Sequence, residues 1–226
     1  MSPAVPTPGH LAMFDLDNTL IDRQGAFARW AERFAAAAGL GREAVEFLVE
    51  VDRDGFATRE EVFAPAKERF GLAGSVKELI AAYRVDYPTC VAPEPEVAAA
   101  LRRLRAAGWR LALVTNGPPS QHEKVARAGL AGLFDAACVS EEIGVAKPDR
   151  AIFDEAARRC GVRLDGPGAL AGWMVGDAPG PDVGGGRGAG LRTIWLHRGR
   201  RWPLEEYRPD ASVGSLPEAV EILLSA

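Results

Sequence analysis

The feature that most constrains the fold is a set of apolar runs of strand length that alternate with helical patterns along the chain. Leu11 to Leu16 is the first such run, and Asp17-Asn18 follows it. A short and mainly apolar run is typical of a strand buried on both faces of a parallel sheet. The later runs are Trp109 to Thr115, Ala136 to Val139, Gly172 to Val175 and Thr193 to Leu196. Strands that alternate with helices predict an α/β fold with a parallel sheet.

Residues 22–91 interrupt this alternation, because they carry four successive helical patterns and no convincing strand. In the first pattern, Phe27, Trp30 and Phe34 fall on one helical face, which predicts a hydrophobic core within the segment itself. We therefore predict two domains. One is an α/β core of residues 1–21 and 92–226, and the other is an all-helical insert of residues 22–91.

Local signals within the insert predict where its later helices begin. Thr58 with Glu61 and Ser75 with Glu78 have the spacing of capping boxes, in which each side chain bonds the other's backbone N–H. Pro65 lies well inside the third helical pattern. Because proline lacks an N–H and clashes with the preceding turn, we expect it to kink or interrupt that helix.

The composition excludes several classes of protein. Of 226 residues, 47% are hydrophobic and 26% are charged, which is the range of a folded globular chain. A formal charge of −4 argues against general binding of nucleic acid. No apolar run reaches the roughly 18 residues of a membrane span, and the start of the chain lacks the pattern of a signal peptide. We therefore expect a soluble, cytoplasmic protein whose three widely separated cysteines are reduced core thiols.

Four short polar segments stand at or just after the ends of predicted strands. They are residues 15–19 (DLDNT), 115–117 (TNG), 147–148 (KP) and 176–182 (GDAPGPD). The carboxyl ends of the strands form the ligand crevice of an open parallel sheet. Side chains as far apart in the sequence as Asp15 and Thr115 are therefore expected to meet there.

These segments, in this order and with a helical insert after the first, resemble the four motifs of the haloacid dehalogenase-like (HAD) hydrolases, in the phosphatase branch. Each motif alone is weak evidence, whereas their order and their placement at strand ends are specific. The resemblance implies a Rossmann-like core with a mobile all-helical cap inserted after the first strand. It also implies hydrolysis of small-molecule phosphate monoesters through an aspartyl-phosphate intermediate.

The carboxylates of these segments predict a metal site. Asp15 and Asp17 leave the first strand two residues apart, and Asp177 follows another strand. Together they concentrate negative charge unless a cation binds between them, and hard carboxylate oxygens select Mg2+. We expect Asp15, Asp17 and Asp177 to hold this ion. The resemblance further implies that Asp15 is the nucleophile, that Asp17 offers its backbone carbonyl to the metal, and that Asp177 offers its side chain.

Asp17 separates two reaction classes. We expect it to be the general acid and base that protonates a leaving alkoxide and then deprotonates the attacking water. A halide leaves as a stable anion and needs no proton. The second carboxylate at position 17 therefore favours phosphate esters over 2-haloacids.

The remaining polar residues of the segments are suited to bind a phosphoryl group. The Thr115 hydroxyl and the backbone N–H of Asn116 can donate to its oxygens, and Lys147 supplies a positive charge that also stabilises a carboxylate nucleophile. We expect Asp182 to orient Lys147 or a metal-bound water. The glycine run from Gly184 to Gly186 is unusual in a predicted helix, and close packing against the catalytic loop is one explanation.

Other polar residues receive no catalytic role. The three histidines show no recurrent metal spacing, and His122 lies within an expected capping box of Ser120 and Glu123. The basic cluster of Arg198, Arg200 and Arg201 is more often a solvated loop than a nucleotide site in an acidic protein.

Several functions remain open at this point. A phosphomutase or a 2-haloacid dehalogenase of the same fold, and a catalytically idle phospholigand-binding protein, are alternatives to a Mg2+-dependent phosphatase. We expect the partner to be a small phosphorylated metabolite, without nucleic acid or membrane, and the protein to be a monomer or homodimer. The sequence does not predict which metabolite is the substrate.

Overall fold

A computed structural model describes residues 10–165 and 172–226. The first nine residues, to which the expectation about a signal peptide refers, lie outside the described residues, as do residues 166–171. The described chain forms two compact units, one of the residues up to Leu20 and from Glu94 onward, and the other of Ile21–Pro93. Among the described residues, no helix combines the length and the apolar character that crossing a membrane requires.

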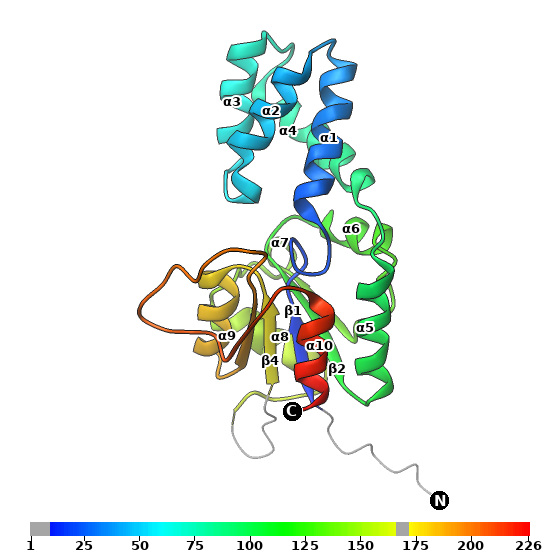
Figure 1. Cartoon of the computed structure of the whole chain (residues 1–226), viewed down its shortest axis with the longest axis vertical. Coiled ribbons are helices and arrows are strands. Elements are labelled where there is room, and N and C mark those ends of the chain that lie inside the picture. Colours follow the sequence, from blue (N-terminus) through cyan, green and yellow to red (C-terminus); the bar gives the residue numbers. More distant parts are fainter. Residues whose placement is uncertain (1–9, 166–171) are drawn as a thin grey trace, which may run out of the picture. The chain divides into compact units, whose positions relative to one another are not determined.

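The first unit is built on a six-stranded sheet (Figure 1). Its strand order is β3-β2-β1-β4-β5-β6, and all five pairings are parallel. This order is that of a Rossmann-like sheet, so the predicted fold class is confirmed. The strands are β1 Leu11–Phe14, β2 Arg110–Thr115, β3 Ala136–Val139, β4 Gly172–Gly176, β5 Arg192–Leu196 and β6 Ala211–Val213.

The strands differ from the sequence prediction at two places. β1 ends at Phe14 rather than Leu16, although the Asp15 N–H still donates to the Val175 carbonyl at 3.0 Å. β6 was not predicted, because it has only three residues and only Val213 is buried. So short a strand offers no period for pattern analysis to detect.

Helices pack on the sheet and bury its apolar side chains. α5 (Pro95–Ala106) contacts α10 (Leu216–Leu224), and Figure 1 shows α10 in front of the sheet with α8 (Arg150–Arg159) behind it. Leu11 and Met13 of β1 form one cluster with Ile152 and Phe153 of α8. Complete burial of a side chain such as Phe153 contributes about 1.5–3 kcal/mol. The remaining elements of this unit are α6 Gln121–Arg127, α7 Ser140–Ile143, the π-helical turn η3 Pro179–Gly184 and α9 Gly185–Gly188.

The second unit is entirely helical within Ile21–Pro93. Both predicted capping boxes are present, with Thr58 at the start of α3 and Ser75 at the start of α4, and each makes the reciprocal bonds with its glutamate. A side-chain cap of this kind stabilises a helix by about 1 kcal/mol. The elements are α1 Arg23–Ala37, α2 Arg42–Asp52, η1 Arg53–Gly55, α3 Arg59–Phe70, α4 Val76–Asp86 and η2 Tyr87–Cys90.

The expected interruption at Pro65 does not occur, because α3 continues through it from Arg59 to Phe70. The helix is fixed on both sides of the proline. Its capping box closes the N-terminus, Gly71 ends it in the left-handed conformation, and Val62, Phe63 and Ala66 are buried around the proline. Tertiary packing therefore outweighs the one backbone hydrogen bond that Pro65 cannot donate.

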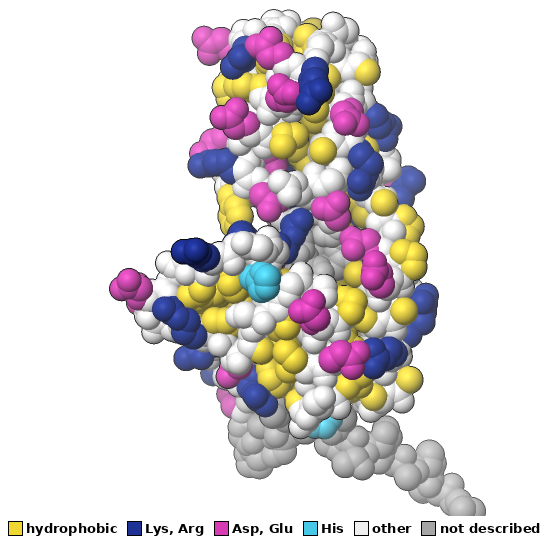
Figure 2. All heavy atoms as spheres, in the orientation of Figure 1, with side chains coloured by type: hydrophobic (Ala, Val, Ile, Leu, Met, Phe, Trp, Pro, Cys, Tyr) yellow, Lys and Arg dark blue, Asp and Glu magenta, His cyan; other side chains and the backbone are white. Residues whose placement is uncertain are grey.

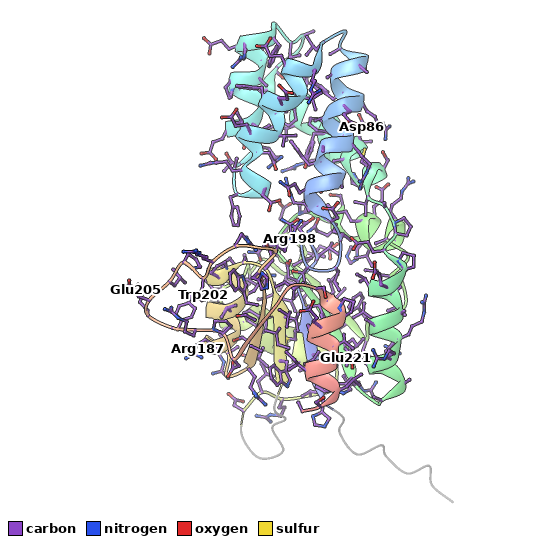
Figure 3. All side chains as sticks on the ribbon, in the orientation of Figure 1. Asp86, Arg187, Arg198, Trp202, Glu205 and Glu221 are labelled. Carbon is purple, nitrogen blue, oxygen red and sulfur yellow. The ribbon has the colours of Figure 1, made fainter. Side chains whose placement is uncertain are left out.

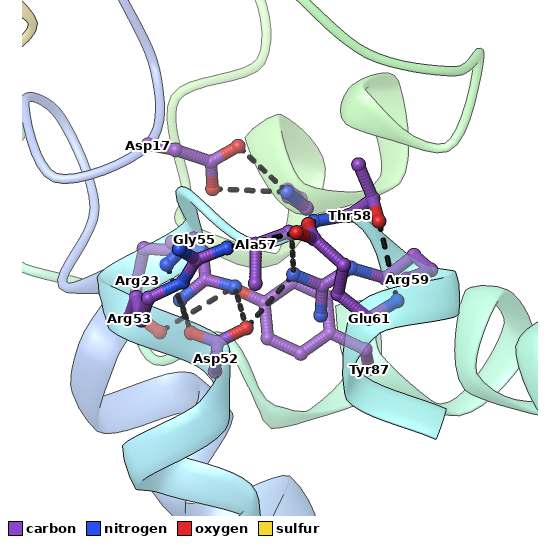
Figure 4. A network of polar contacts seen from close by, with 11 residues as sticks. Asp17, Arg23, Asp52, Arg53, Gly55, Ala57, Thr58, Arg59, Glu61 and Tyr87 are labelled. Atoms are coloured by element: carbon purple, nitrogen blue, oxygen red, sulfur yellow. Dashed lines mark hydrogen bonds and ion pairs between the residues drawn. The ribbon is translucent and has the colours of Figure 1, made fainter. Parts of the chain in front are cut away.

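An aromatic core holds the helical unit together, as the stripe on its first helix predicted. Trp30 stacks on Phe34 with ring centroids 5.1 Å apart and meets Tyr83 edge-on at 4.8 Å. Beside this core lies a buried charge cluster (Figure 4), in which Asp52 is paired with Arg23 and with Arg59, the latter at 2.8 Å. Asp52 is only 1% exposed, so its charge depends on these two guanidinium groups.

Candidate active site

Two of the predicted acidic residues lie beside each other at the carboxyl edge of the sheet. β1 and β4 are neighbours, and Asp15 and Asp177 directly follow their last residues. The strand order reverses between these two strands, which is where ligands bind in open α/β sheets. One oxygen each of Asp15, Asp177 and Asp182 lies within 4.8 Å of the others, and all three residues are buried.

Lys147 joins two of these carboxylates. Its Nζ donates to Oδ1 of Asp15 and to Oδ1 of Asp182, at 2.7 Å in each case. The lysine is 4% exposed. Although burial disfavours the charged amine, the carboxylates of Asp15 and Asp182 raise the pKa of Lys147 above its usual range. The amine therefore stays protonated beside the predicted nucleophile.

The side chain of Asn116 has a role that the sequence did not indicate. Its amide donates to the Lys147 carbonyl at 2.9 Å, and its Oδ1 accepts from the Lys147 N–H at 2.8 Å. This reciprocal pair fixes the backbone of Lys147 to the end of β2. The amide of Asn116 thus controls where the lysine side chain begins, while its own backbone N–H is the group predicted to bind phosphate.

Asp182 is held in the η3 turn with both oxygens occupied. Oδ1 accepts from Lys147, and Oδ2 accepts from the Ala178 N–H at 2.8 Å. A side chain on Gly176 would place its Cβ 2.2 Å from Oδ2 of Asp182. Glycine at the end of β4 is therefore needed for the carboxylate to reach Lys147.

The glycine run after this turn allows the same close packing. A Cβ on Gly185 would lie 2.9 Å from Cα of Pro148, the residue after the lysine, and a Cβ on Gly186 would lie 2.8 Å from Cβ of Met174. Real Cβ atoms essentially never make contacts shorter than 3.0 Å. The run therefore lets α9 approach both β4 and the segment that carries Lys147.

The three clustered carboxylates are suited to a divalent cation. Burial, followed by the charges of Asp182 and Asp177, raises the pKa of Asp15 to about 8, against the opposing effect of Lys147. Burial and Asp182 raise the pKa of Asp177 to about 6. Both groups would be stabilised in their ionised form by a positive ion between them. Hard oxygen donors in this arrangement fit a divalent cation, with Asp15 and Asp177 better placed than Asp182, whose oxygens are already bonded.

Arg200 is not a residue of a merely solvated loop, which corrects the interpretation of the basic cluster. Its Nη2 donates to Oδ2 of Asp177 at 2.9 Å and to the Asp177 carbonyl at 2.8 Å. Figure 3 shows Arg198, Trp202 and Glu205 along the same loop after β5. The loop turns back over the edge of the sheet, so Arg200 reaches a carboxylate 23 positions earlier in the chain.

Asp17 is bound by two residues of α6 that the sequence analysis did not select. Nζ of Lys124 lies 2.9 and 2.8 Å from the two carboxylate oxygens. Nε2 of Gln121 donates to Oδ2 of Asp17 at 3.0 Å and to Oγ1 of Thr115 at 2.7 Å. Gln121 thus connects Asp17 with Thr115. The available signal was the spacing of Gln121 and Lys124, which places both on one helical face directly after the TNG segment.

The expected capping box at the start of α6 is absent. Ser120 is the N-cap residue, but its side chain makes no capping bond, because its backbone has helical angles of φ −62° and ψ −9° instead of the extended angles that aim a cap. Glu123 pairs with Arg127 at 3.3 Å, and His122 lies 3.0 Å from Glu142 on the surface.

Comparison with known proteins identifies the family. Residues 10–190 match the model of the haloacid dehalogenase-like hydrolases, and the chain belongs to this family. The resemblance inferred from the four polar segments is therefore confirmed.

The relatives include two curated proteins and a solved structure. The chain is 38% identical over 210 residues to the phosphoserine phosphatase of Thermus thermophilus, an alignment that covers 87% of this chain and 78% of that protein. It is 33% identical over 211 residues to the glyceraldehyde 3-phosphate phosphatase of Methanopyrus kandleri, with 88% of both chains covered. The structure of 2-haloacid dehalogenase from Pseudomonas syringae is 31% identical with a TM-score of 0.64, and the match covers 96% of this chain and 99% of that one. Both curated relatives are named as phosphatases, in agreement with the predicted branch of the family.

Proposed function

We propose that this hydrolase is a Mg2+-dependent phosphatase of small-molecule phosphate monoesters that forms an aspartyl phosphate on Asp15. The observation that carries the proposal is the buried Asp15 carboxylate, 2.7 Å from the Lys147 amine, within a cluster of acidic oxygens at the switch point of the sheet. The positive charge of the Lys147 amine reduces the repulsion between the Asp15 carboxylate and an incoming phosphate monoester dianion.

The groups around Asp15 supply the remaining requirements of phosphoryl transfer. The hydroxyl of Thr115, the backbone N–H of Asn116 and the amine of Lys147 bind the phosphoryl oxygens. Mg2+, held by the Asp15 and Asp177 side chains and the Asp17 carbonyl, would neutralise charge that develops on these oxygens. Asp182 keeps Lys147 directed at Asp15, and Arg200 keeps Asp177 in place.

The reaction proceeds in two steps on the residues of this chain. In the first, an oxygen of Asp15 attacks phosphorus, the ester P–O bond breaks, and Asp17 gives its proton to the leaving alkoxide. In the second, Asp17 takes a proton from water, the water oxygen bonds to phosphorus, and the bond to Asp15 breaks. The products are an alcohol and inorganic phosphate, with Asp15 and Asp17 restored.

The helical unit has the position in the sequence of a cap, and we assign residues 22–91 to substrate selection. The two curated relatives are named for phosphoserine and for glyceraldehyde 3-phosphate, both small phosphate monoesters, and a compound of this class is the proposed substrate. Acidic and basic side chains are interspersed over the face shown in Figure 2, without a continuous basic strip for a nucleic-acid backbone. A soluble cytoplasmic monomer or homodimer is part of the same proposal.

A screen of the purified protein against phosphorylated metabolites tests this function. Phosphoserine, glyceraldehyde 3-phosphate, sugar phosphates and nucleoside monophosphates are incubated with and without Mg2+, and free phosphate is measured. The proposal expects release that depends on Mg2+ with at least one ester. Transfer of phosphate within a substrate without release would indicate a mutase, and binding without turnover would indicate the idle protein.

The likeness to a 2-haloacid dehalogenase makes one more assay necessary. Halide release from a 2-haloacid, measured beside the phosphatase assay, decides between the two chemistries. The proposal expects no halide, because Asp17, the proposed proton donor, serves an alkoxide leaving group and has no use with a halide. Halide release with no phosphatase activity would overturn it.

A further inference from the structure

Gln121 and Lys124 are polar side chains at buried positions, where apolar side chains would cost less free energy to bury. Gln121 is 1% exposed and Lys124 is 7% exposed, and they lie three residues apart on α6. Burial of an amide and an ammonium group costs free energy unless both are bonded. Their bonds go to Asp17 and Thr115, which come from the ends of two different strands. A helix that exists only to cover the sheet would not require these residues.

The orientation of the Gln121 amide follows from its partners. The Gln121 Nε2 group donates to Oδ2 of Asp17 at 3.0 Å, and this carboxyl oxygen can accept the bond whether or not the other oxygen carries a proton. The same nitrogen lies 2.7 Å from Oγ1 of Thr115, and 3.4 Å from the Asn116 carbonyl. With its two hydrogens directed to Asp17 and Thr115, the amide makes the Thr115 oxygen an acceptor.

This arrangement determines what the Thr115 hydroxyl can do. A hydroxyl has one hydrogen, and its oxygen already accepts from Gln121. The hydrogen is therefore directed away from Gln121 and is available as a donor to an anionic oxygen. If residue 121 were an acceptor, the Thr115 hydrogen would be used for it, and the hydroxyl oxygen would present lone pairs to the phosphoryl group.

Lys124 completes the arrangement on the side of Asp17. Its amine contacts both oxygens of that carboxylate, at 2.9 and 2.8 Å, while Gln121 contacts one of them. Three contacts from one short helix fix the plane of a carboxylate whose side chain is 26% exposed. A general acid and base needs such a fixed direction, because proton transfer requires a positioned partner.

We propose that Gln121 and Lys124 are positioning residues: Gln121 makes Thr115 a donor toward the phosphoryl group, and both residues hold the Asp17 carboxylate in its working orientation. The proposal rests on the phosphatase function proposed above. It differs from a structural role, which would alter stability but leave each folded molecule with the same phosphate affinity and the same kcat.

The decisive variant is Gln121→Glu, which keeps the shape of the side chain but replaces the donor by an acceptor. We expect kcat/KM to fall about 10²-fold or more, as when one aligned donor to a developing oxyanion is lost. Binding of inorganic phosphate in the presence of Mg2+, measured by calorimetry without turnover, should weaken about tenfold or more. Gln121→Met, which is neutral and of similar length, should also lower kcat/KM and weaken phosphate binding. It replaces the glutamate variant in the test if that variant does not fold.

A double-mutant cycle separates the action through Thr115 from general damage. With Thr115→Val, which lacks the hydroxyl, addition of Gln121→Met should weaken phosphate binding less than twofold further. A control variant is Glu123→Gln, an exposed position of the same helix, whose phosphate affinity and kcat should equal those of the wild type.

Lys124 is tested through the leaving group. Lys124→Met should lower the rate of phosphoenzyme formation about tenfold or more with alkyl phosphates and less with aryl phosphates, since aryl leaving groups need less protonation. Lys124→Arg should restore part of the loss. Wild-type phosphate affinity and kcat in folded Gln121→Glu and Gln121→Met would overturn the role of Gln121. Equal losses in the rate of phosphoenzyme formation for alkyl and aryl esters in Lys124→Met would overturn that of Lys124. A wild type without phosphatase activity would instead refute the function on which both depend.

Discussion

Nζ of Lys147 lies 2.7 Å from Oδ1 of Asp15, and both side chains are almost completely buried. The same amine is bonded to Asp182, so a single positive charge compensates two carboxylates that water hardly reaches. Removal of one partner from a buried ion pair leaves the other charge uncompensated, which is costly. The candidate site is therefore also a determinant of stability.

Lys147→Met should lower the free energy of unfolding by about 3–5 kcal/mol at pH 8 and abolish phosphatase activity. Urea denaturation followed by circular dichroism measures the first effect. Arg42→Met is a suitable control, since its pair with Glu46 is exposed and should contribute within about 0.5 kcal/mol. A loss below about 1 kcal/mol in Lys147→Met would show that Asp15 and Asp182 do not depend on the amine.

The raised pKa values predict how Mg2+ binding depends on pH. Asp15 has a pKa of about 8 and Asp177 of about 6 in the folded protein without metal, each against an ordinary value of 3.8. For a carboxyl group whose pKa is raised on folding, the folded state binds more protons, so its contribution to stability falls as pH rises from about 4 to about 8. Mg2+ must displace these protons at low pH.

The increase in melting temperature on addition of Mg2+ should therefore be larger at pH 8 than at pH 6. Thermal unfolding in EDTA and in excess Mg2+ at the two pH values measures it. Asp177→Asn should remove most of the increase in melting temperature that Mg2+ causes, at pH 6 and at pH 8. An equal increase at pH 6 and pH 8 would mean that the ion does not bind to Asp15 and Asp177.

Asp17→Asn keeps the size of the side chain but removes the proton donor. We expect a loss of about 10²- to 10⁴-fold with alkyl phosphates and a smaller loss in the phosphorylation step with aryl phosphates. Rapid-quench measurement of phosphoenzyme formation isolates that step. Equal losses for both ester types would exclude Asp17 as the general acid.

Asp52→Ala tests the charge cluster of the helical unit. Asp52 is buried between Arg23 and Arg59, so its removal leaves two guanidinium groups without their carboxylate. The free energy of unfolding of the helical unit should fall by about 3–5 kcal/mol. Limited proteolysis followed by mass spectrometry should show earlier cleavage within residues 21–93 than in the wild type. Resistance to cleavage equal to that of the wild type would show that the cluster does not stabilise the unit.

The sheet was predictable because each of its longer strands is an apolar run that ends close to a polar residue, although the first run was expected to extend to Leu16 and β1 ends at Phe14. Asp15, Thr115 and Asp177 stand at those strand ends, so parallel topology alone brings them to one edge. β6 was not predictable from its three residues. The interruption of α3 expected at Pro65 was wrong, because the local effect of the proline is weaker than the packing of Phe63 and Ala66 around it.

The contacts that complete the site could not be read from the sequence. Lys124 reaches Asp17 across 107 positions and Arg200 reaches Asp177 across 23, and no local spacing encodes either pair. Basic residues in an acidic chain are usually solvated, and for this reason the sequence analysis expected Arg200 to lie in a solvated loop. The side chain of Asn116 was overlooked because a TNG turn directs attention to its backbone N–H.

Capture of the covalent intermediate tests the central claim most directly. Wild-type protein is mixed with a substrate ester and Mg2+, quenched in acid within milliseconds, digested and analysed by mass spectrometry, with Asp15→Asn treated in parallel. We predict a phosphate on Asp15 of the wild type, and in the folded variant neither a phosphopeptide nor turnover. A phosphate on another residue, or near wild-type turnover in Asp15→Asn, would contradict the assignment of Asp15 as the nucleophile.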